Sequence, residues 1–335
     1  MQGTARLKEL AKSRVLILDG AMGTAIQQRS LTAEDFIYPG TNKTLQGCND
    51  LLTLSRPDVI KDIHCDYIKA NADIIETNTF GANAFSLKDY GLEDKVYELN
   101  FAAASLARES IEIATRAGHV QPLRTDGDFD LEEERTIFVA GDIGPTGRSA
   151  SFSPSVDDPA YRESDFSEFR EMYREQVRGL LDGGVDLLIV ETIFDTLVAK
   201  AALSAIMDEF EERNIELPIM VSATFSDKSR RTLSGQELEA FISSMSSYPI
   251  FTLGVNCSTG AAEMIPLIKD LAKLSPFGTS AHPNAGFPDN DGNYIQTPDE
   301  IAAELAPVLE QGLVNIIGGC CGTRPEHIAA IAKMA

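Results

Sequence analysis

The sequence predicts an α/β protein whose eight β–α units close into a (β/α)8 (TIM) barrel. Eight short apolar runs recur along the 335 residues. Most of them are apolar on both faces, as is typical of parallel strands buried on both sides. Amphipathic stretches with helix-capping residues separate the runs. A doubly wound dinucleotide-binding sheet is the alternative, but no Gly-x-Gly-x-x-Gly follows the first run.

The expected strands share a short apolar pattern that ends in a polar residue or in glycine. In chain order they are residues 15–19, 73–78, 137–142, 186–191, 219–224, 252–256, 279–283 and 314–317. Helix starts are expected where a capping residue precedes proline or an apolar periodic stretch. Three helices are expected to begin at Ser55-Arg56-Pro57-Asp58, which precedes the second strand, at Thr297-Pro298-Asp299-Glu300 and at Thr323-Arg324-Pro325-Glu326. Two more are expected over residues 166–181, before the fourth strand, and 196–213, before the fifth.

A barrel of this kind needs about 250 residues, so the surplus is expected in loops. Three insertions are predicted: residues 29–49 after the first strand, the acidic stretch 125–134 before the third, and the Gly-, Pro- and Ser-rich stretch 143–165 after it. No linker long enough to separate a second domain is present. Residues 1–335 are therefore expected to form a single domain.

Composition narrows the classes of function. Lys and Arg number 29 against 51 Asp and Glu, a net charge of −22, which argues against partners such as nucleic acid or anionic membranes. No apolar run approaches the roughly 20 residues of a membrane span. The N-terminus is polar and has no signal-peptide core. Five scattered cysteines fit a reducing cytoplasm better than a disulfide framework.

Two adjacent cysteines in Gly318-Gly319-Cys320-Cys321-Gly322 follow the last expected strand. Their Cα atoms lie about 3.8 Å apart, below the roughly 4.4 Å that disulfides need. The glycines permit a sharp turn that lets both sulfurs face one soft metal ion. Cys257 ends the sixth expected strand at the same mouth, so three thiolates can converge. Three such ligands and an open fourth position are typical of catalytic Zn²⁺.

Alternatives remain for each candidate. A lone buried cysteine such as Cys257 is usually a small hydrophobe. His282 can be a ligand or a hydrogen-bonded structural histidine, and Asn284 is a candidate oxygen ligand at the fourth position. Asp19 and Glu191 can be helix-capping or supporting carboxylates. Cys48 in a long loop and Cys65 on a helical stretch are poor ligand candidates.

Zinc held by three thiolates has a formal charge of −1 and is a weak Lewis acid. It is better suited to binding and deprotonating a fourth thiol than to hydrolysis. If the substrate is an amino-acid thiol, Asp19 and Glu191 can bind its ammonium group. Backbone N–H groups around Gly20, in residues 20–24, can bind its carboxylate.

The chain resembles the homocysteine S-methyltransferase family over nearly its whole length, and within it the homocysteine-binding domain of the cobalamin-dependent branch. The matching motifs are LDGAMGT (18–24), ADIIETNTF (72–80), GPTGRSASFSPSVDDPAYR (144–162), VDLLIVETIFDTLVAKAA (185–202), GVNC (254–257), SAHPNAGFP (280–288) and GGCCGT (318–323). The resemblance implies a (β/α)8 barrel with zinc on Cys257, Cys320 and Cys321. It also implies homocysteine sulfur as the fourth ligand and ammonium contacts from Asp19, Glu191 and Thr192.

The branch implies methylcobalamin as methyl donor, remethylated from methyltetrahydrofolate. Cobalamin-binding and folate-binding domains or proteins are then the expected partners, with the chain either a cut piece or a split-gene protein. Other members of the family use betaine or S-methylmethionine. The acidic stretch 125–134 departs from the family pattern without touching the site. A zinc- or redox-sensing protein and a zinc hydrolase are the competing classes.

Overall fold

Eight strands lie at the eight predicted positions. They are β1 (Leu16–Ile17), β2 (Ile74–Glu76), β3 (Phe138–Ile143), β4 (Leu187–Ile193), β5 (Ile219–Ala223), β6 (Thr252–Gly260), β7 (Gly278–Asn284) and β8 (Ile316–Ile317). The structure is a computed structural model and describes residues 2–38, 45–120, 135–225 and 229–335.

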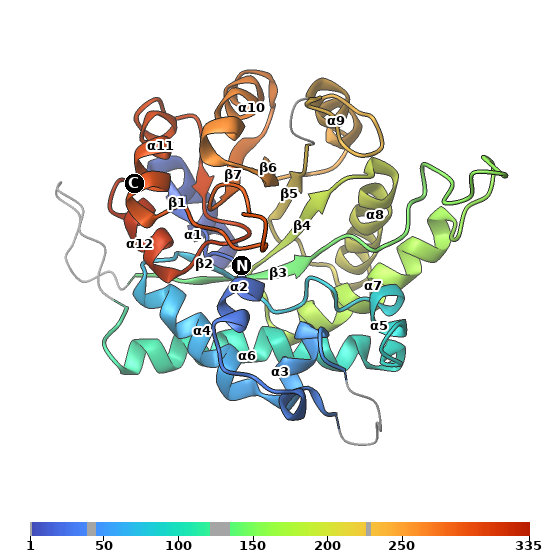
Figure 1. Cartoon of the computed structure of the whole chain (residues 1–335), viewed down its shortest axis with the longest axis horizontal. Helices are drawn as coiled ribbons and strands as arrows, with labels where there is room; N and C mark the ends of the chain where they lie inside the picture. The colour runs from blue at the N-terminus through green and yellow to red at the C-terminus, as the bar shows by residue number, and fades with distance from the viewer. Residues whose placement is uncertain (1, 39–44, 121–134, 226–228) are drawn as a thin grey trace.

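The strands are parallel and pair in the order β1-β8-β7-β6-β5-β4-β3-β2. The two ends of this sheet meet, because Leu18 bridges to Ile74 and the Asp19 N–H donates to the Ile74 carbonyl at 3.0 Å. The sheet therefore closes on itself. The predicted (β/α)8 barrel is confirmed (Figure 1).

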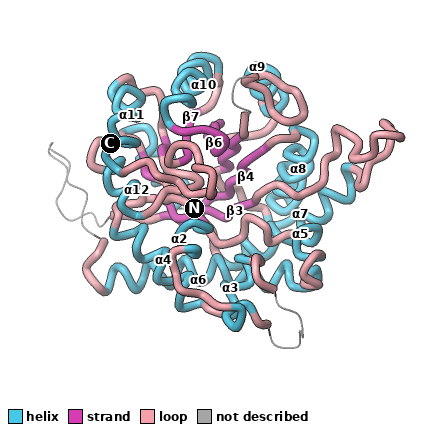
Figure 2. Tube along the Cα trace, viewed as in Figure 1, coloured by secondary structure: helices cyan, strands magenta, loops and turns pink. Residues whose placement is uncertain are grey.

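Helices surround the strands on the outside of the barrel (Figure 2). They are α1 (Gln2–Ser13), α2 (Met22–Gln27), α3 (Leu52–Ser55), α4 (Pro57–Lys69), α5 (Ala84–Lys88), α6 (Val96–Arg116), α7 (Phe166–Gly183), α8 (Thr196–Arg213), α9 (Leu238–Met245), α10 (Ala261–Leu274), α11 (Pro298–Glu310) and α12 (Pro325–Ala332). Among the described residues, no helix combines the length and apolar character that crossing a membrane requires.

Local capping chemistry explains several helix boundaries. Thr297 and Glu300 form the predicted capping box at α11, and α7 ends at Gly184 in the left-handed conformation (φ 92°). The capping box predicted for Thr323 at α12 is wrong. Arg324 is the N-cap there, and its N–H donates to His327 Nδ1 at 3.2 Å.

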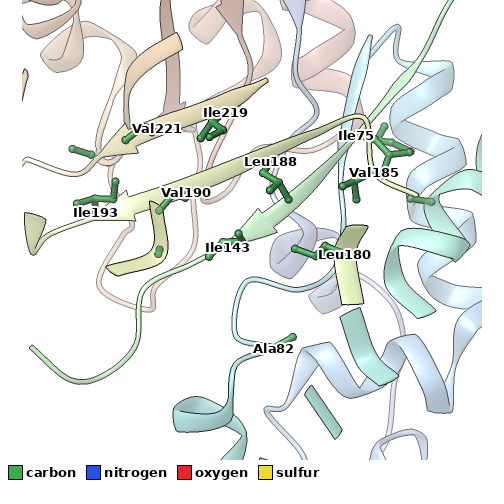
Figure 3. Close-up of a cluster of buried hydrophobic side chains, with 14 of the residues drawn as sticks. Ile75, Ala82, Ile143, Leu180, Val185, Leu188, Val190, Ile193, Ile219 and Val221 are labelled. Carbon is green, nitrogen blue, oxygen red and sulfur yellow. The ribbon is translucent and has the colours of Figure 1, made fainter. Parts of the chain in front are cut away.

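The alternating faces of each strand build two apolar cores. The outer core lies between the strands and the helices, and Figure 3 shows part of it with Ile75, Leu180 and Leu188. The inner core fills the barrel with residues such as Leu16 and Phe138. It also contains Leu7 and Leu10 of α1, so the N-terminal helix closes one end of the barrel. The inner core leaves the other end open for polar groups.

The segment 144–165 follows β3 without a helix or strand, as the predicted insertion requires. Asp195, the N-cap of α8, binds this segment to the barrel. This carboxylate accepts hydrogen bonds from the hydroxyls of Ser149 and Ser151 and from the N–H groups of Ala150 and Ser151. Residues 29–38 and 45–49 of the first predicted insertion run between α2 and α3. The predicted acidic insertion 125–134 lies outside the described residues.

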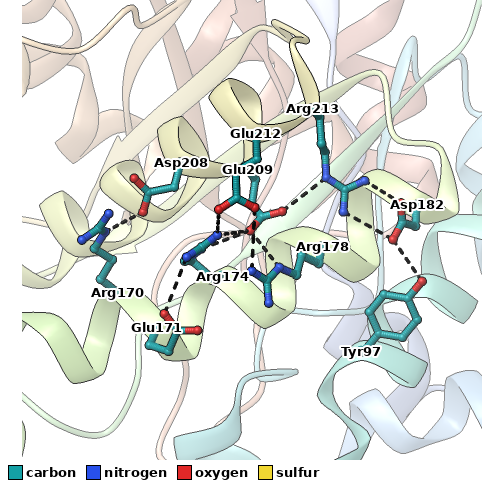
Figure 4. A network of polar contacts seen from close by, with 10 residues as sticks. All are labelled: Tyr97, Arg170, Glu171, Arg174, Arg178, Asp182, Asp208, Glu209, Glu212 and Arg213. Atoms are coloured by element: carbon teal, nitrogen blue, oxygen red, sulfur yellow. Dashed lines mark hydrogen bonds and ion pairs between the residues drawn. The ribbon is translucent and has the colours of Figure 1, made fainter.

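Ion pairs connect α7 and α8 on the outside of the barrel (Figure 4). Glu209, with a side chain 2% exposed, pairs with Arg174 at 3.0 Å, Arg178 at 2.8 Å and Arg213 at 3.3 Å. Arg213 also pairs with Asp182. The buried carboxylate thus has three guanidinium partners.

Candidate functional site

The carboxyl ends of the eight strands converge on a cavity of about 670 Å³. Cys257, Cys320 and Cys321 line it together with the acidic residues Glu76, Asp142 and Glu191. This end of a (β/α)8 barrel is where such enzymes place their sites. The cavity therefore combines soft sulfur ligands and acidic groups in one volume.

The three cysteines predicted as ligands lie together. Their Sγ atoms are all within 4.8 Å of one another, and Cys257 Sγ lies 3.7 Å from Cys321 Sγ. Among the described residues these three form the one group of His, Cys, Asp or Glu side chains with metal-ligand spacing. Cys65 lies elsewhere and donates to the Ser110 carbonyl at 3.6 Å. We name this cluster, Cys257 with Cys320 and Cys321, the sulfur tripod.

A turn immediately after β8 brings the adjacent cysteines to the same cavity. The Cys320 N–H donates to the Pro283 carbonyl at 2.8 Å, and Cys321 O accepts from the Ala285 N–H at 2.9 Å. Gly322 has φ +80°, and a Cβ there would lie 2.2 Å from the ring of Tyr294. Only glycine meets both conditions at this position. The turn is thus fixed by β7 on one side and by Tyr294 on the other.

Cys257 reaches the tripod because β6 is irregular. The pairing of β6 with β7 shifts register between Asn256 and Gly260, and Cys257 and Ser258 have left-handed φ angles of 59° and 64°. A β-bulge of this kind turns a side chain out of the regular strand alternation. The strain of non-glycine residues with positive φ is typical of functional sites.

The spacing and charge of the tripod fit a bound metal ion. Tetrahedral zinc with Zn–S bonds of about 2.3 Å places neighbouring sulfurs about 3.8 Å apart, close to the observed 3.7 Å. Hydrogen bonds from Cys257 and Cys320 lower the pKa of Cys321 to about 3. The shared hydrogen bond with Cys257 raises the pKa of Cys320 well above its usual range. Without a cation, the three sulfurs therefore hold about one negative charge.

Asn284 and His282 lie on β7, between β6 and β8. Asn284 is 3% exposed, and among the described residues its Oδ1 has no hydrogen-bond partner. A buried oxygen without a hydrogen-bond partner at the end of β7, the strand between those that lead to Cys257 and Cys320, keeps Asn284 as a candidate oxygen ligand. The structure supports neither prediction for His282. Its ring is 1% exposed and outside the ligand group, and no described residue bonds its nitrogens.

Four acidic side chains lie at the ends of β1 to β4. Glu76, Asp142 and Glu191 line the cavity, whereas Asp19 is buried beside them and is not part of its lining. Asp19 and Glu191 were predicted site residues, and the structure adds Glu76 and Asp142 to them. We name these four residues the mouth acids. Among the described residues none of them forms an ion pair with Lys, Arg or His, although Asp19 Oδ2 accepts from the Glu76 N–H at 3.1 Å. In the sequence, Glu76 and Asp142 stand at the ends of expected strands, as Asp19 and Glu191 do. This shared position is the signal by which the sequence could have identified them as site residues.

Burial perturbs all of these carboxyl groups. Desolvation, followed by the charge of Glu191, raises the pKa of Asp142 and of Glu76 well above the usual range. Desolvation also raises the pKa of Asp19 well above its usual value. For Glu191, desolvation and then the charge of Cys321 raise the pKa to about 7. Uncompensated acids in a cavity are typical of a site that binds a cation.

Thr192 lies beside the mouth acids in a strained conformation. Its φ angle is 53°, an outlier for a β-branched residue, and the β4–β5 pairing shifts register between Val190 and Ile193. The side-chain amide of Asn256 bonds both the N–H and the hydroxyl of Thr192, at 3.1 and 2.8 Å. Reasoning from the sequence assigned no role to Asn256, because these contacts with Thr192 join residues 64 positions apart in the chain.

Gly20 also lines the cavity. A Cβ on Gly20 would lie 2.7 Å from the hydroxyl oxygen of Thr323. The Thr323 hydroxyl accepts from the Ala21 N–H at 3.2 Å and donates to the Cys320 carbonyl at 2.7 Å. Thr323 thus joins the loop after β1 to the tripod turn instead of capping α12. It also uses one of the N–H groups in 20–24 that were expected to bind a carboxylate.

A sequence model of the family described as homocysteine S-methyltransferase matches residues 16–335. Among solved structures, the metallated form of the homocysteine methyltransferase MmuM from Escherichia coli is 24% identical, with 98% of each chain covered and a TM-score of 0.73. The oxidized form is 23% identical, with 96% of each chain covered and a TM-score of 0.72. At these identities the likeness establishes a common fold.

Proposed function

This chain belongs to the homocysteine S-methyltransferase family, and on that premise we propose that it is a zinc-dependent enzyme that methylates the sulfur of homocysteine to give methionine. Cys257, Cys320 and Cys321 hold the zinc ion. The observation that carries this proposal is the convergence of the three sulfurs at the wall of a cavity that also contains the mouth acids.

A zinc ion on three thiolates lowers the pKa of a fourth sulfur ligand, so a thiol that it binds is a nucleophile at neutral pH. The protein's own residues place that thiol. The tripod faces the open cavity, so the substrate sulfur reaches it from the mouth of the barrel. Transfer forms a carbon–sulfur bond and breaks the bond between the methyl carbon and its donor. The thiol proton is released when the sulfur binds.

The ammonium group of homocysteine is bound at the mouth acids, with Asp19 and Glu191 as the main partners and Thr192 and Gly20 beside them. A cation there restores the charge balance that the described side chains lack. The raised pKa values mean that the substrate-free mouth retains protons near neutral pH. An ammonium group takes their place and lets the carboxyl groups ionise.

Methylcobalamin, carried by another domain or a partner protein and remethylated from methyltetrahydrofolate, is the proposed methyl donor. The serine-rich segment 144–162 and the HPNAG motif support it through their resemblance to the cobalamin-dependent branch. Betaine and S-methylmethionine are the alternative donors. For each donor, methyl transfer to homocysteine is measured with the purified chain, and methylcobalamin is expected to give the fastest transfer. Faster transfer from either small donor would refute this assignment.

Metal content tests the tripod. The purified protein is expected to hold about one equivalent of zinc. Replacing Cys257, Cys320 or Cys321 with alanine should remove it, whereas Cys65→Ala serves as the matched control and should retain it. Far-ultraviolet circular dichroism checks that each variant is folded. A folded wild-type protein reconstituted in zinc and still metal-free would refute the proposal.

X-ray absorption at the zinc edge tests the substrate sulfur. The expected coordination changes from three sulfurs and one oxygen or nitrogen to four sulfurs when homocysteine is added. An unchanged spectrum, together with reversible oxidation of Cys320 and Cys321, would support a zinc- or redox-sensing protein that uses this vicinal pair instead. The sulfurs of the pair lie within 4.8 Å of each other, which is the observation that favours this second candidate.

A further inference from the structure

Asn256 is a buried asparagine on β6 whose side chain joins three parts of the mouth. It is 1% exposed. Its Oδ1 accepts from the Thr192 N–H at 3.1 Å and from the Ser222 hydroxyl at 2.7 Å. Its Nδ2 donates to Thr192 Oγ1 at 2.8 Å and to Glu191 Oε2 at 3.2 Å, and lies 4.0 Å from Cys320 Sγ. The amide thus uses both its acceptor and its donor capacity.

These contacts link residues of two different proposed roles. Glu191 and Thr192 end β4 and belong to the ammonium side of the cavity. Cys257 follows Asn256 directly in the chain, and Cys320 lies after β8. One rigid amide therefore ties the substrate-binding acid of one strand to the sulfur of Cys320 and directly precedes Cys257, a second residue of the tripod. Among the described residues, no other side chain hydrogen-bonds both Glu191 and a tripod cysteine.

The same amide stabilises strained backbone. Thr192 and Cys257 both have left-handed φ angles, 53° and 59°. Such conformations cost about 1–3 kcal/mol each and persist where the surroundings determine them. Two of the hydrogen bonds of Asn256 go to Thr192 itself, and its own backbone leads into the bulge at Cys257. The strained conformation at Thr192 is therefore held by this side chain, and the bulge at Cys257 begins at the next residue of the chain.

Only a carboxamide suits this position. An aspartate would retain the two acceptor contacts, but it could donate to neither Glu191 nor Thr192 Oγ1 and would add a further acid to an acidic cavity. A serine has one donor and cannot span the contacts. The need for paired donor and acceptor atoms distinguishes Asn256 from a residue that only fills space.

We propose that Asn256 is a positioning residue that couples recognition of the substrate's ammonium group to placement of the sulfur tripod. This inference rests on the proposed function of the same site. Asn256 itself does not contact the substrate. It holds Glu191 and Thr192 in the geometry that binds the ammonium group while the tripod holds the metal. The chain then distinguishes amino-acid thiols from thiols without an amino group.

The test compares the binding of two thiols to the zinc-loaded protein by calorimetry. The probes are homocysteine and 4-mercaptobutanoate, which is homocysteine without its amino group. The wild-type protein is expected to bind homocysteine at least about 10-fold more tightly, since a hydrogen-bonded charge is worth about 1.5–3 kcal/mol, a factor of roughly 10 to 150. Asn256→Ser is expected to reduce this ratio below about 5-fold. In turnover assays, KM for homocysteine is expected to rise more than kcat falls.

Asn100→Ser is the matched control. Asn100 is also fully buried, and its Nδ2 donates to the Ala82 and Val96 carbonyls in the outer shell. This variant is expected to lose thermal stability while keeping the binding ratio. Asn256→Asp, which has the same shape, is a second variant should Asn256→Ser not fold, and it is expected to reduce the ratio in the same way.

The outcomes distinguish a failure of the positioning role of Asn256 from a failure of the proposed function. If folded Asn256 variants keep the wild-type ratio, or if Asn100→Ser lowers it equally, the positioning role is wrong and the proposed function stands. If the zinc-loaded wild-type protein binds neither thiol, the proposed function itself fails. A reduced ratio in the Asn256 variants alone supports the coupling.

Discussion

Two groups of buried acids in this chain differ in how their charge is compensated. Glu209, between α7 and α8 on the outside of the barrel, contacts three guanidinium groups within 3.3 Å (Figure 4). The mouth acids have no cationic partner among the described residues, and desolvation raises the pKa of each. One group has its cationic partners within the chain, whereas the other lacks, among the described residues, the cation that the proposed substrate would supply.

The difference separates structural charge from functional charge. A buried carboxylate with partners contributes to packing between helices, and its removal leaves unpaired cations. A buried carboxylate without partners costs free energy that a substrate cation recovers on binding. Substitutions in the two groups are therefore expected to have opposite consequences for stability and for binding.

The largest effect is expected for Glu209→Ala. This substitution leaves Arg174, Arg178 and Arg213 without their shared partner, and it should lower the free energy of unfolding by about 3–4 kcal/mol. Urea denaturation measures the loss. KM for homocysteine should not change in the folded fraction. A raised KM would show that Glu209 also affects substrate binding, contrary to the proposed difference between Glu209 and the mouth acids.

The pH dependence of stability is expected to follow the mouth acids. The pKa of Glu191 is raised from 4.5 to about 7, so between these pH values the folded state binds more protons than the unfolded state. The free energy of unfolding of the substrate-free protein should therefore fall as pH rises from about 4.5 to 7, by about 3 kcal/mol for this group.

Glu191→Gln removes this titrating group, so its unfolding free energy should fall less steeply over the same pH range. Urea denaturation at several pH values compares it with the wild-type protein. Glu209→Gln is the control and should keep the wild-type slope. Parallel curves for Glu191→Gln and the wild type would show that Glu191 titrates normally, and the contrast between the groups would then disappear.

Asp19→Asn is expected to separate binding from stability. The amide retains an acceptor for the Glu76 N–H and cannot ionise. Because burial already raises the pKa of Asp19 well above its usual value, the free energy of unfolding of the substrate-free protein at pH 7 should stay nearly equal. KM for homocysteine should rise by about 100-fold, because the variant loses the interaction between Asp19 and the ammonium group of the substrate. A factor of 100 corresponds to about 2.7 kcal/mol, the free energy of two pKa units. Steady-state kinetics and thermal denaturation measure the two effects. A destabilised variant with normal KM would place Asp19 among the structural acids.

The smallest effect is expected at the edge of the outer network. Arg170 pairs with Asp208 at 2.5 Å, but its side chain is 44% exposed. Solvent screens such a pair, so Arg170→Ala should change the free energy of unfolding by less than about 1 kcal/mol. Raising the salt concentration should reduce even this difference. A loss of unfolding free energy as large as that of Glu209→Ala would mean that the contribution of these ion pairs to stability does not depend on their exposure to solvent.

Much of the fold and part of the site could be predicted from the chain. The eight strands, α8 at residues 196–213 and the capping box of α11 follow local patterns of apolar spacing and capping. Cys257, Cys320 and Cys321 were grouped because barrel topology brings strand ends together, and their sulfurs do lie together. Glu191 lines the cavity for the same reason, and Asp19 lies buried at the end of β1 next to Glu76.

Other features could not be predicted, because they depend on contacts between distant residues. Thr323 looked like a helix cap, yet its hydroxyl bonds the loop after β1, 302 residues away in the chain. His282 is buried on β7, where no described residue hydrogen-bonds either nitrogen of its ring. The bulges at Thr192 and Cys257 have no pattern in the sequence, since each is a difference in register between two strands.

The sequence by itself determined the class of this protein: the barrel, the sulfur ligands and the acids at the strand ends. These features need only local periodicity and one topological rule, that parallel strands end at the same face. Only the tertiary structure decided which acids have partners and which do not. Compensation of a buried charge depends on side chains brought together from separate strands and helices, and it is this balance that distinguishes Glu209 from the mouth acids.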